Sequence, residues 1–224
     1  MPFLNLMNVG VAMSWEIFNI IGTIAFALSG AIIASEEDYD LIGYYALGFI
    51  TAFGGGAIRN LLIGAPGTTL WSQGSLFLIS FLLITVIYVL PLENLTKRKH
   101  WELTFGLLDA IGLAAFAIQG ALFAKELGLP SSAIITSALL TGVGGGIIRD
   151  ALAKRQPFVF KYDLYAFWTI MTGIIISFRH TTNEWELYIL FILIVSLRMF
   201  SLKYGWHIPR PRKTSNSLNT NSET

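Results

Sequence analysis

Long apolar runs dominate the chain, and short polar stretches separate them. Seven runs of about 17–23 residues can be traced, and a run of this length can cross a hydrocarbon layer of ~30 Å as a helix. The expected spans are residues 15–34, 41–63, 74–92, 103–124, 131–153, 162–178 and 185–204. The pattern therefore predicts an all-α membrane protein with seven transmembrane helices.

The first three spans resemble the next three. When the sequence is shifted by 90 positions, residues 22–62 align with residues 112–152 without a gap and with 15 identities in 41 positions. An odd number of spans in each copy places the second copy upside down in the membrane, as in the inverted repeats of many transport proteins. The sequence thus predicts two inverted three-helix repeats, 15–92 and 103–178, plus one extra helix, 185–204, which we expect to serve packing or a contact between subunits.

One motif recurs in both copies: a glycine triplet followed three residues later by an arginine. The motif residues are Gly54, Gly55, Gly56, Arg59 and Asn60 in the first copy and Gly144, Gly145, Gly146, Arg149 and Asp150 in the second. Glycine costs roughly 1 kcal/mol relative to alanine in a helix interior, so three in a row weaken the helix. The motif favours a helix break whose freed backbone carbonyls line an ion pathway. The alternative is close packing of helices.

Arginine is expensive inside a membrane, so both motif arginines should face protein or water. By its place in the expected spans, Arg149 lies at a depth similar to that of Asp109, and we expect the two to form a buried ion pair. Near Arg59, asparagine replaces both carboxylates of the second copy, at Asn19 and Asn60. We hypothesise that these are gating or pore residues, with one arginine anchored and the other freer to respond to ions or voltage. The alternative is that both arginines extend to the nearer interface.

The basic residues are unevenly distributed over the loops. With the N-terminus outside, the inner loops and the tail hold most of the lysines and arginines, including the basic loop 97–100. The positive-inside rule therefore places the C-terminus in the cytoplasm. Residues 1–14 then form an outer extension and residues 205–224 a polar cytoplasmic tail. We expect a multi-pass protein of the cell (inner) membrane, with the lipid bilayer as a partner.

The composition argues against enzyme chemistry. The chain has no cysteine, which excludes disulfides and thiolate sites. It also has no Ser/His/Asp arrangement, no phosphate-binding loop and no nucleotide motif. We therefore expect no enzyme activity, no catalytic residues, no metal site, no cofactor and no nucleic-acid partner.

The two motifs read FGGGAIRN and VGGGIIRD, one in each half of a chain built as three plus three plus one spans. In this they resemble the TRIC family of trimeric intracellular cation channels, in its prokaryotic branch. The resemblance implies a homotrimer with a potassium-permeable pore in each protomer, between the two repeats. It also implies that the second and fifth spans bend at the glycine triplets. The family motif ends in Arg-Asp, which this chain keeps at 149–150 but not at 59–60.

Two function classes remain open. A channel for potassium or sodium ions gives unitary currents, whereas a secondary transporter of a small solute such as an amino acid gives saturable, coupled uptake. Inverted repeats serve both classes, and prokaryotic members of the family have also been described as glycine-transporter-like. A structural membrane protein would show neither activity. The channel is the function that we expect.

Overall fold

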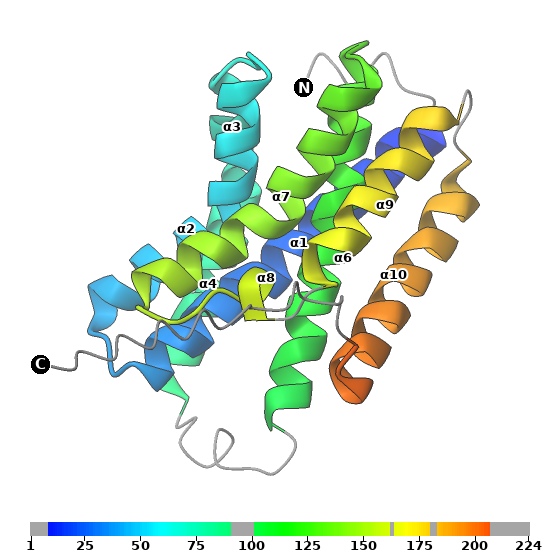
Figure 1. Cartoon of the computed structure of the whole chain (residues 1–224). Helices are drawn as coiled ribbons and strands as arrows, with labels where there is room; N and C mark the ends of the chain where they lie inside the picture. Colours follow the sequence, from blue (N-terminus) through cyan, green and yellow to red (C-terminus); the bar gives the residue numbers. More distant parts are fainter. Residues whose placement is uncertain (1–8, 91–100, 162–163, 180–182, 207–224) are drawn as a thin grey trace, which may run out of the picture.

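The computed structural model describes residues 9–90, 101–161, 164–179 and 183–206 (Figure 1). Within these ranges the regular structure is helical. The helices are α1 (Val9–Glu36), α2 (Leu41–Leu62), α3 (Thr68–Trp71), α4 (Gly74–Val89), α6 (Trp101–Glu126), α7 (Ser131–Leu152), α8 (Phe158–Lys161), α9 (Tyr165–Phe178) and α10 (Glu184–Tyr204). Most of the predicted outer extension and tail, and the basic loop 97–100, lie outside the described residues.

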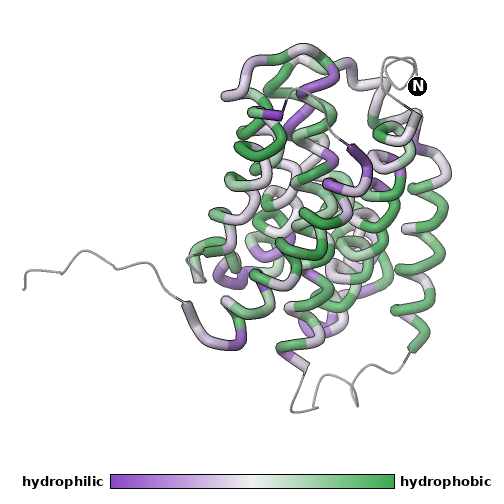
Figure 2. Tube along the Cα trace, turned by 90° about the vertical axis from the view of Figure 1, so that its right-hand side faces the viewer, coloured by the Kyte–Doolittle hydropathy of each residue, from purple (hydrophilic) through white to green (hydrophobic). Residues whose placement is uncertain are grey.

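Five of the described helices are long and apolar enough to cross a membrane: α1, α2, α6, α7 and α10. The helices α4 and α9 lie where the third and sixth spans were predicted, but they are shorter than expected, with 16 and 14 residues. At 1.5 Å per residue they extend only about 24 and 21 Å. The one-turn helices α3 and α8 precede them. Figure 2 shows hydrophobic residues along most of the helical length, with hydrophilic residues concentrated toward the helix ends.

Helices α1 and α6 form the centre of the bundle. The most apolar stretch of α6 is 83% buried and that of α1 is 72% buried, compared with 28% for α10. Both central helices are rich in alanine and glycine, so neighbouring helices can approach them closely. Figure 1 shows α2 and α4 on one side of this pair and α9 and α10 on the other, with α7 crossing in front.

Helices α2 and α7 cross where their glycine triplets meet. A methyl carbon on Gly55 would lie 2.8 Å from the backbone oxygen of Thr141. A methyl carbon on Gly145 would overlap the backbone oxygen of Thr51. The two backbones therefore touch without intervening side chains, and any larger residue at either glycine would force the helices apart.

The predicted helix break at the triplets is wrong. Both α2 and α7 are helical throughout their triplets, so these glycines free no run of carbonyls from the helix ladder. Gly144 lies against the same crossing, since a methyl carbon there would be 3.1 Å from the Cα atom of Gly55. Gly54 faces the side chain of Ile148 on α7. Close approach of two backbones, rather than a break, accounts for Gly55, Gly144 and Gly145.

The two copies of the repeat make equivalent, reciprocal contacts between α1 and α6. A methyl carbon on Gly22 would lie 2.5 Å from Cδ1 of Phe116, and one on Gly112 would overlap the ring of Phe26. The rings of Phe26 and Phe116 meet edge to face with their centroids 5.2 Å apart, a favoured arrangement of aromatic pairs. The aligned positions of the two copies are therefore direct partners in the fold.

Candidate functional site

Arg149 lies near the C-terminal end of α7 and is fully buried, with 0% exposure. Its Nη1 is 3.1 Å from Oδ1 of Asp109 on α6, and its Nε is 2.7 Å from Oδ1 of Asp150. Nη1 also donates a hydrogen bond to the hydroxyl of Ser29 on α1. The predicted ion pair with Asp109 is confirmed. Two carboxylates compensate the buried guanidinium, which a buried charge requires.

Aromatic rings complete the surroundings of Arg149. Its guanidinium carbon lies 5.1 Å from the ring centroid of Phe105 and 5.7 Å from that of Phe158. A cation held over an aromatic face is stabilised by the ring quadrupole. The second oxygen of Asp150 accepts a hydrogen bond of 3.1 Å from the backbone N–H of Phe158. Asp150 therefore joins the arginine to the start of α8.

Arg59 occupies the matching position on α2 and is 4% exposed. Its Nε and Nη2 donate to Oδ1 of Asn60 at 3.0 and 2.9 Å, and its Nη1 donates to Oε1 of Gln119 at 2.8 Å. The ring of Phe123 lies 4.3 Å from its guanidinium carbon. No ion pair links Arg59 to a carboxylate of the described residues. Neutral oxygens hold a cation less strongly than carboxylates do. The predicted difference in carboxylate partners is confirmed, and the response of Arg59 to ions or voltage stays a prediction.

Each arginine bonds a residue of the opposite copy. Arg59 bonds Gln119 on α6, Arg149 bonds Ser29 on α1, and these two partners are 90 positions apart in the sequence. The alternative that both arginines extend to the nearer interface is therefore wrong, because both are buried and held inside the bundle. Gln119 bonds across helices to Arg59 and also lines a cavity.

The predicted site residues Asn19 and Asn60 belong to a neutral chain of hydrogen bonds at the Arg59 end. Asn19 donates to Oε1 of Gln73 at 3.0 Å, and Gln73 donates to the backbone oxygen of Thr69 at 3.1 Å. Asn60 donates to the hydroxyl of Thr69 at 2.8 Å. These hydrogen bonds connect α3 to α1 and α2. Asn19 thus contacts this network, whereas its counterpart in the second copy pairs with the arginine.

The last glycine of each triplet lies beside the arginine of its own motif. A methyl carbon on Gly56 would be 3.7 Å from Nη2 of Arg59, and one on Gly146 would be 3.8 Å from Nη2 of Arg149. The hydroxyl of Tyr165 is closer to Gly146, at 3.1 Å from the same methyl position. These glycines therefore leave room for polar atoms, not for another backbone.

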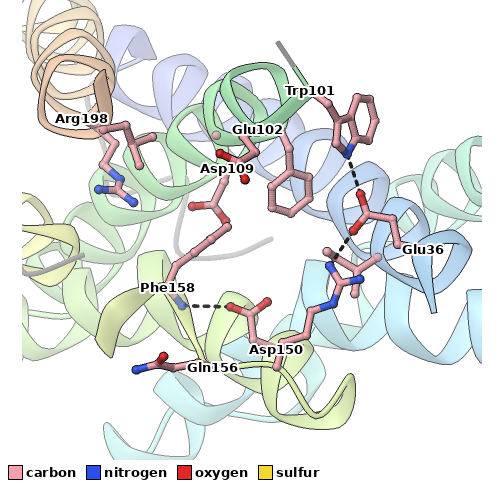
Figure 3. Close-up of a pocket in the computed structure, with 13 residues that line it drawn as sticks. Glu36, Trp101, Glu102, Asp109, Asp150, Gln156, Phe158 and Arg198 are labelled. Carbon is pink, nitrogen blue, oxygen red and sulfur yellow. Dashed lines mark hydrogen bonds and ion pairs between the residues drawn. The ribbon is translucent and has the colours of Figure 1, made fainter. Parts of the chain in front are cut away.

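A cavity of about 460 Å³ is lined by Asp109 and Asp150, the two carboxylates that pair with Arg149. Figure 3 shows its lining, which includes the charged residues Glu36, Glu102, Asp109, Asp150, Arg155 and Arg198. Oδ2 of Asp109 is buried and accepts no hydrogen bond from the described residues. Such an atom is suited to bind water or a cation that enters the cavity. Within the described ranges, no three or more His, Cys, Asp or Glu side chains lie close enough together to hold a metal ion.

A network of hydrogen bonds borders this cavity and was not predicted. Glu36, at the end of α1, accepts from Nε1 of Trp101 at 2.6 Å and from Nη1 of Arg155 at 2.6 Å. Glu37 accepts from Nε of Arg155 at 2.6 Å. Partial burial lowers the pKa of Arg155, but the hydrogen bonds to both glutamates outweigh it and raise this pKa above its ordinary value. The network links α1, the start of α6 and the segment after α7.

The extra helix α10 contributes more than packing. Arg198 is 1% exposed, lies over the ring of Tyr165 with its guanidinium carbon 4.6 Å from the centroid, and lines the large cavity. In Figure 3 it lies across the cavity from the Trp101–Glu36 hydrogen bond. An arginine in an apolar run is a recognised indicator of a functional position. That signal was present in the sequence, but the prediction for this helix did not use it.

A second, smaller cavity lies beside Arg59. Its volume is about 20 Å³, which is enough for about one water molecule. Polar residues form much of its lining: Asn19, Thr23, Arg59, Gln73, Gln119 and Thr141. Arg59 thus lines a small cavity, whereas the carboxylate partners of Arg149 line a much larger one.

Buried charges beside cavities in a bundle of apolar helices define a polytopic membrane protein with a polar interior. A family model described as "Glycine transporter" matches residues 16–92 and 106–181, which cover both copies. The UPF0126 membrane protein YvgT of Bacillus subtilis (strain 168) is 53% identical over 88% of this chain and 96% of its own length. The UPF0126 inner membrane protein YadS of Escherichia coli (strain K12) is 30% identical over 86% of this chain and 93% of its own.

Solved structures of TRIC channels share the fold. A TRIC cation channel solved to explain its conductance is 34% identical, with a TM-score of 0.75 over 88% of this chain and 97% of its own. A prokaryotic TRIC channel in 0.5 M KCl is 30% identical, with a TM-score of 0.76 over 88% of this chain and 99% of its own. The chain belongs to the TRIC family, in its prokaryotic branch, and is a multi-pass membrane protein.

Proposed function

We propose that the chain is a channel for monovalent cations, permeable to potassium, with a pore inside each protomer of a homotrimer. The observation that carries the proposal is the likeness over 88% of the chain to TRIC cation channels at 34% and 30% identity. The cell (inner) membrane is the proposed location, with the N-terminus outside. The permeant ions are potassium or sodium, and no cofactor takes part.

The proposed architecture is a pair of inverted repeats followed by one extra span. The first repeat comprises α1, α2 and α4, the second comprises α6, α7 and α9, and α10 is the extra span. The reciprocal contacts of Phe26 with Gly112 and of Phe116 with Gly22 support this arrangement. So do the hydrogen bonds by which each arginine reaches the opposite copy.

The proposed ion pathway joins the two cavities and passes the crossing of the glycine triplets. Carboxylates in the large cavity attract cations. Arg149 does not oppose them, because Asp109 and Asp150 compensate its charge. Arg59 has no such compensation, and the cavity beside it is small. We therefore assign gating to the Arg59 end.

Purified protein in planar bilayers tests the channel proposal. It should give unitary currents with an ohmic amplitude, and their reversal potential should follow a potassium gradient. The name of the matched family model favours one other function, secondary transport of a small solute such as an amino acid. Saturable, coupled uptake without unitary currents would support that function. The matched solved structures are channels, which favours the channel function over transport.

A further inference from the structure

The two cavities are separated by a buried layer of the bundle. On α6, the large cavity ends at Asp109 and the small one begins at Phe116. These positions are about 10 Å apart along the helix at 1.5 Å per residue. On α1, Thr23 lines the small cavity and Ile33 lines the large one. An ion that moves between the cavities has to pass this layer.

Phe26 lies within this layer and is 0% exposed. Its ring is held in a slot between two helices, because the positions that face it are glycines. A methyl carbon on Gly112 of α6 would overlap the ring, and one on Gly145 of α7 would lie 3.0 Å from its Cδ2 atom. The edge-to-face contact with Phe116, which lines the small cavity, closes the third side.

We propose that the ring of Phe26 is the dry barrier of the pathway and that it opens when the ring leaves its glycine slot. This inference rests on the proposed channel function and adds the residue that closes it. An apolar constriction excludes ions because it offers no oxygen ligands in place of their hydration shells. The slot also gives Gly145 a second role, since it permits both the α2–α7 crossing and the seating of the ring.

The barrier couples conduction to the position of α7. The ring contacts α6 through Gly112 and α7 through Gly145, so a shift of α7 away from α1 widens the slot. Arg149 lies four residues further along α7 and is bonded to Ser29 on α1. The Arg149–Ser29 hydrogen bond and the contact of the Phe26 ring with Gly145 therefore both hold α7 against α1.

The test compares Phe26→Ala with Phe18→Ala in proteoliposomes and planar bilayers. Phe18 is also 0% exposed on α1, but it packs against Tyr188 and Phe191 of α10, away from both cavities. We expect Phe26→Ala to raise the open probability, and with it the potassium flux, by about tenfold or more. Phe18→Ala should leave both at the parent's value. Detergent chromatography establishes that each variant keeps the parent's assembly.

If Phe26→Ala does not fold, Phe26→Leu replaces it in the flux measurement, because leucine is apolar but smaller than phenylalanine. It should raise the flux in the same direction and to a smaller extent. Folded Phe26 variants with the parent's open probability, or an equal increase in Phe18→Ala, overturn the barrier. If neither the parent nor any variant gives unitary currents, the channel function itself fails. That result differs from a conducting parent whose Phe26 variants are unchanged.

Discussion

Arg149 and Asp109 form an ion pair in the centre of the bundle, with Nη1 3.1 Å from Oδ1 and side-chain exposures of 0% and 1%. The two residues come from α7 and α6, so the pair fastens one helix of the α2–α7 crossing to the central pair of helices. The matching arginine, Arg59, is held by neutral oxygens. The two copies of the motif thus differ in the charge of the groups that hold their arginines.

Asp109→Asn should lower the free energy of unfolding by about 2–3 kcal/mol, because it leaves a buried guanidinium with one carboxylate partner in place of two. Asp150 keeps its bond to Arg149 in the variant, which limits the loss. Denaturation in detergent measures the effect. Glu102→Gln is the matched control, since Glu102 lines the same cavity but is exposed. A variant as stable as the parent would contradict a structural role for the pair.

Arg59→Gln should change the voltage dependence of the open probability more than it changes the stability of the protein. One elementary charge moving across the whole field contributes about 2.3 kcal/mol per 100 mV. Of the two motif arginines, Arg59 is the one that forms no ion pair with a carboxylate of the described residues. Arg149→Gln is the comparison, and it should mainly destabilise the protein because it orphans two buried carboxylates. Equal voltage dependence in Arg59→Gln and the parent would show that gating lies elsewhere.

Gly145→Ala should destabilise the fold by about 1–3 kcal/mol, the usual cost of an added methyl group in a packed interior. The new carbon would overlap the backbone oxygen of Thr51, which cannot move without shifting α2. Gly67→Ala is the control, because nothing lies within 4 Å of the corresponding methyl position. Thermal unfolding of the two variants side by side gives the comparison. Equal melting temperatures would mean that the crossing tolerates separation.

Glu36→Gln should cost less than about 1 kcal/mol, because the ion pair with Arg155 is partly exposed and screened by salt. The loss should shrink further at high ionic strength. Raising the pH from 7 to 10 should leave the difference between parent and variant unchanged. The pKa of Arg155 is raised in the folded protein, so its contribution is present below the ordinary arginine pKa and is lost only above it. A difference that disappears by pH 10 would contradict this assignment.

The buried ion pair could be predicted because it depends on depth alone. The position of Asp109 in one span and Arg149 in another places both at one level of the bundle. The continuous helices at the glycine triplets could not be predicted in the same way. A triplet weakens an isolated helix, but whether it breaks depends on what lies opposite. Here another glycine lies opposite, and the contact between two backbones offsets the weakness.

The large cavity was the least predictable part of the site. Its residues come from helix ends that are far apart in the sequence, such as Glu36 and Arg155, and no spacing rule connects them. Helix length was also overestimated for α4, which ends at Val89, and for α9, which begins at Tyr165. An apolar run does not show at which of its residues the helix starts or stops. Arg198, by contrast, was visible as a charge in an apolar run.

Single-channel recording of the purified protein under a potassium gradient tests the channel proposal most directly. The proposal predicts unitary currents whose reversal potential follows the gradient and whose open probability rises in Phe26→Ala. Saturable solute uptake with no unitary current in the parent or in any Phe26 variant would contradict it.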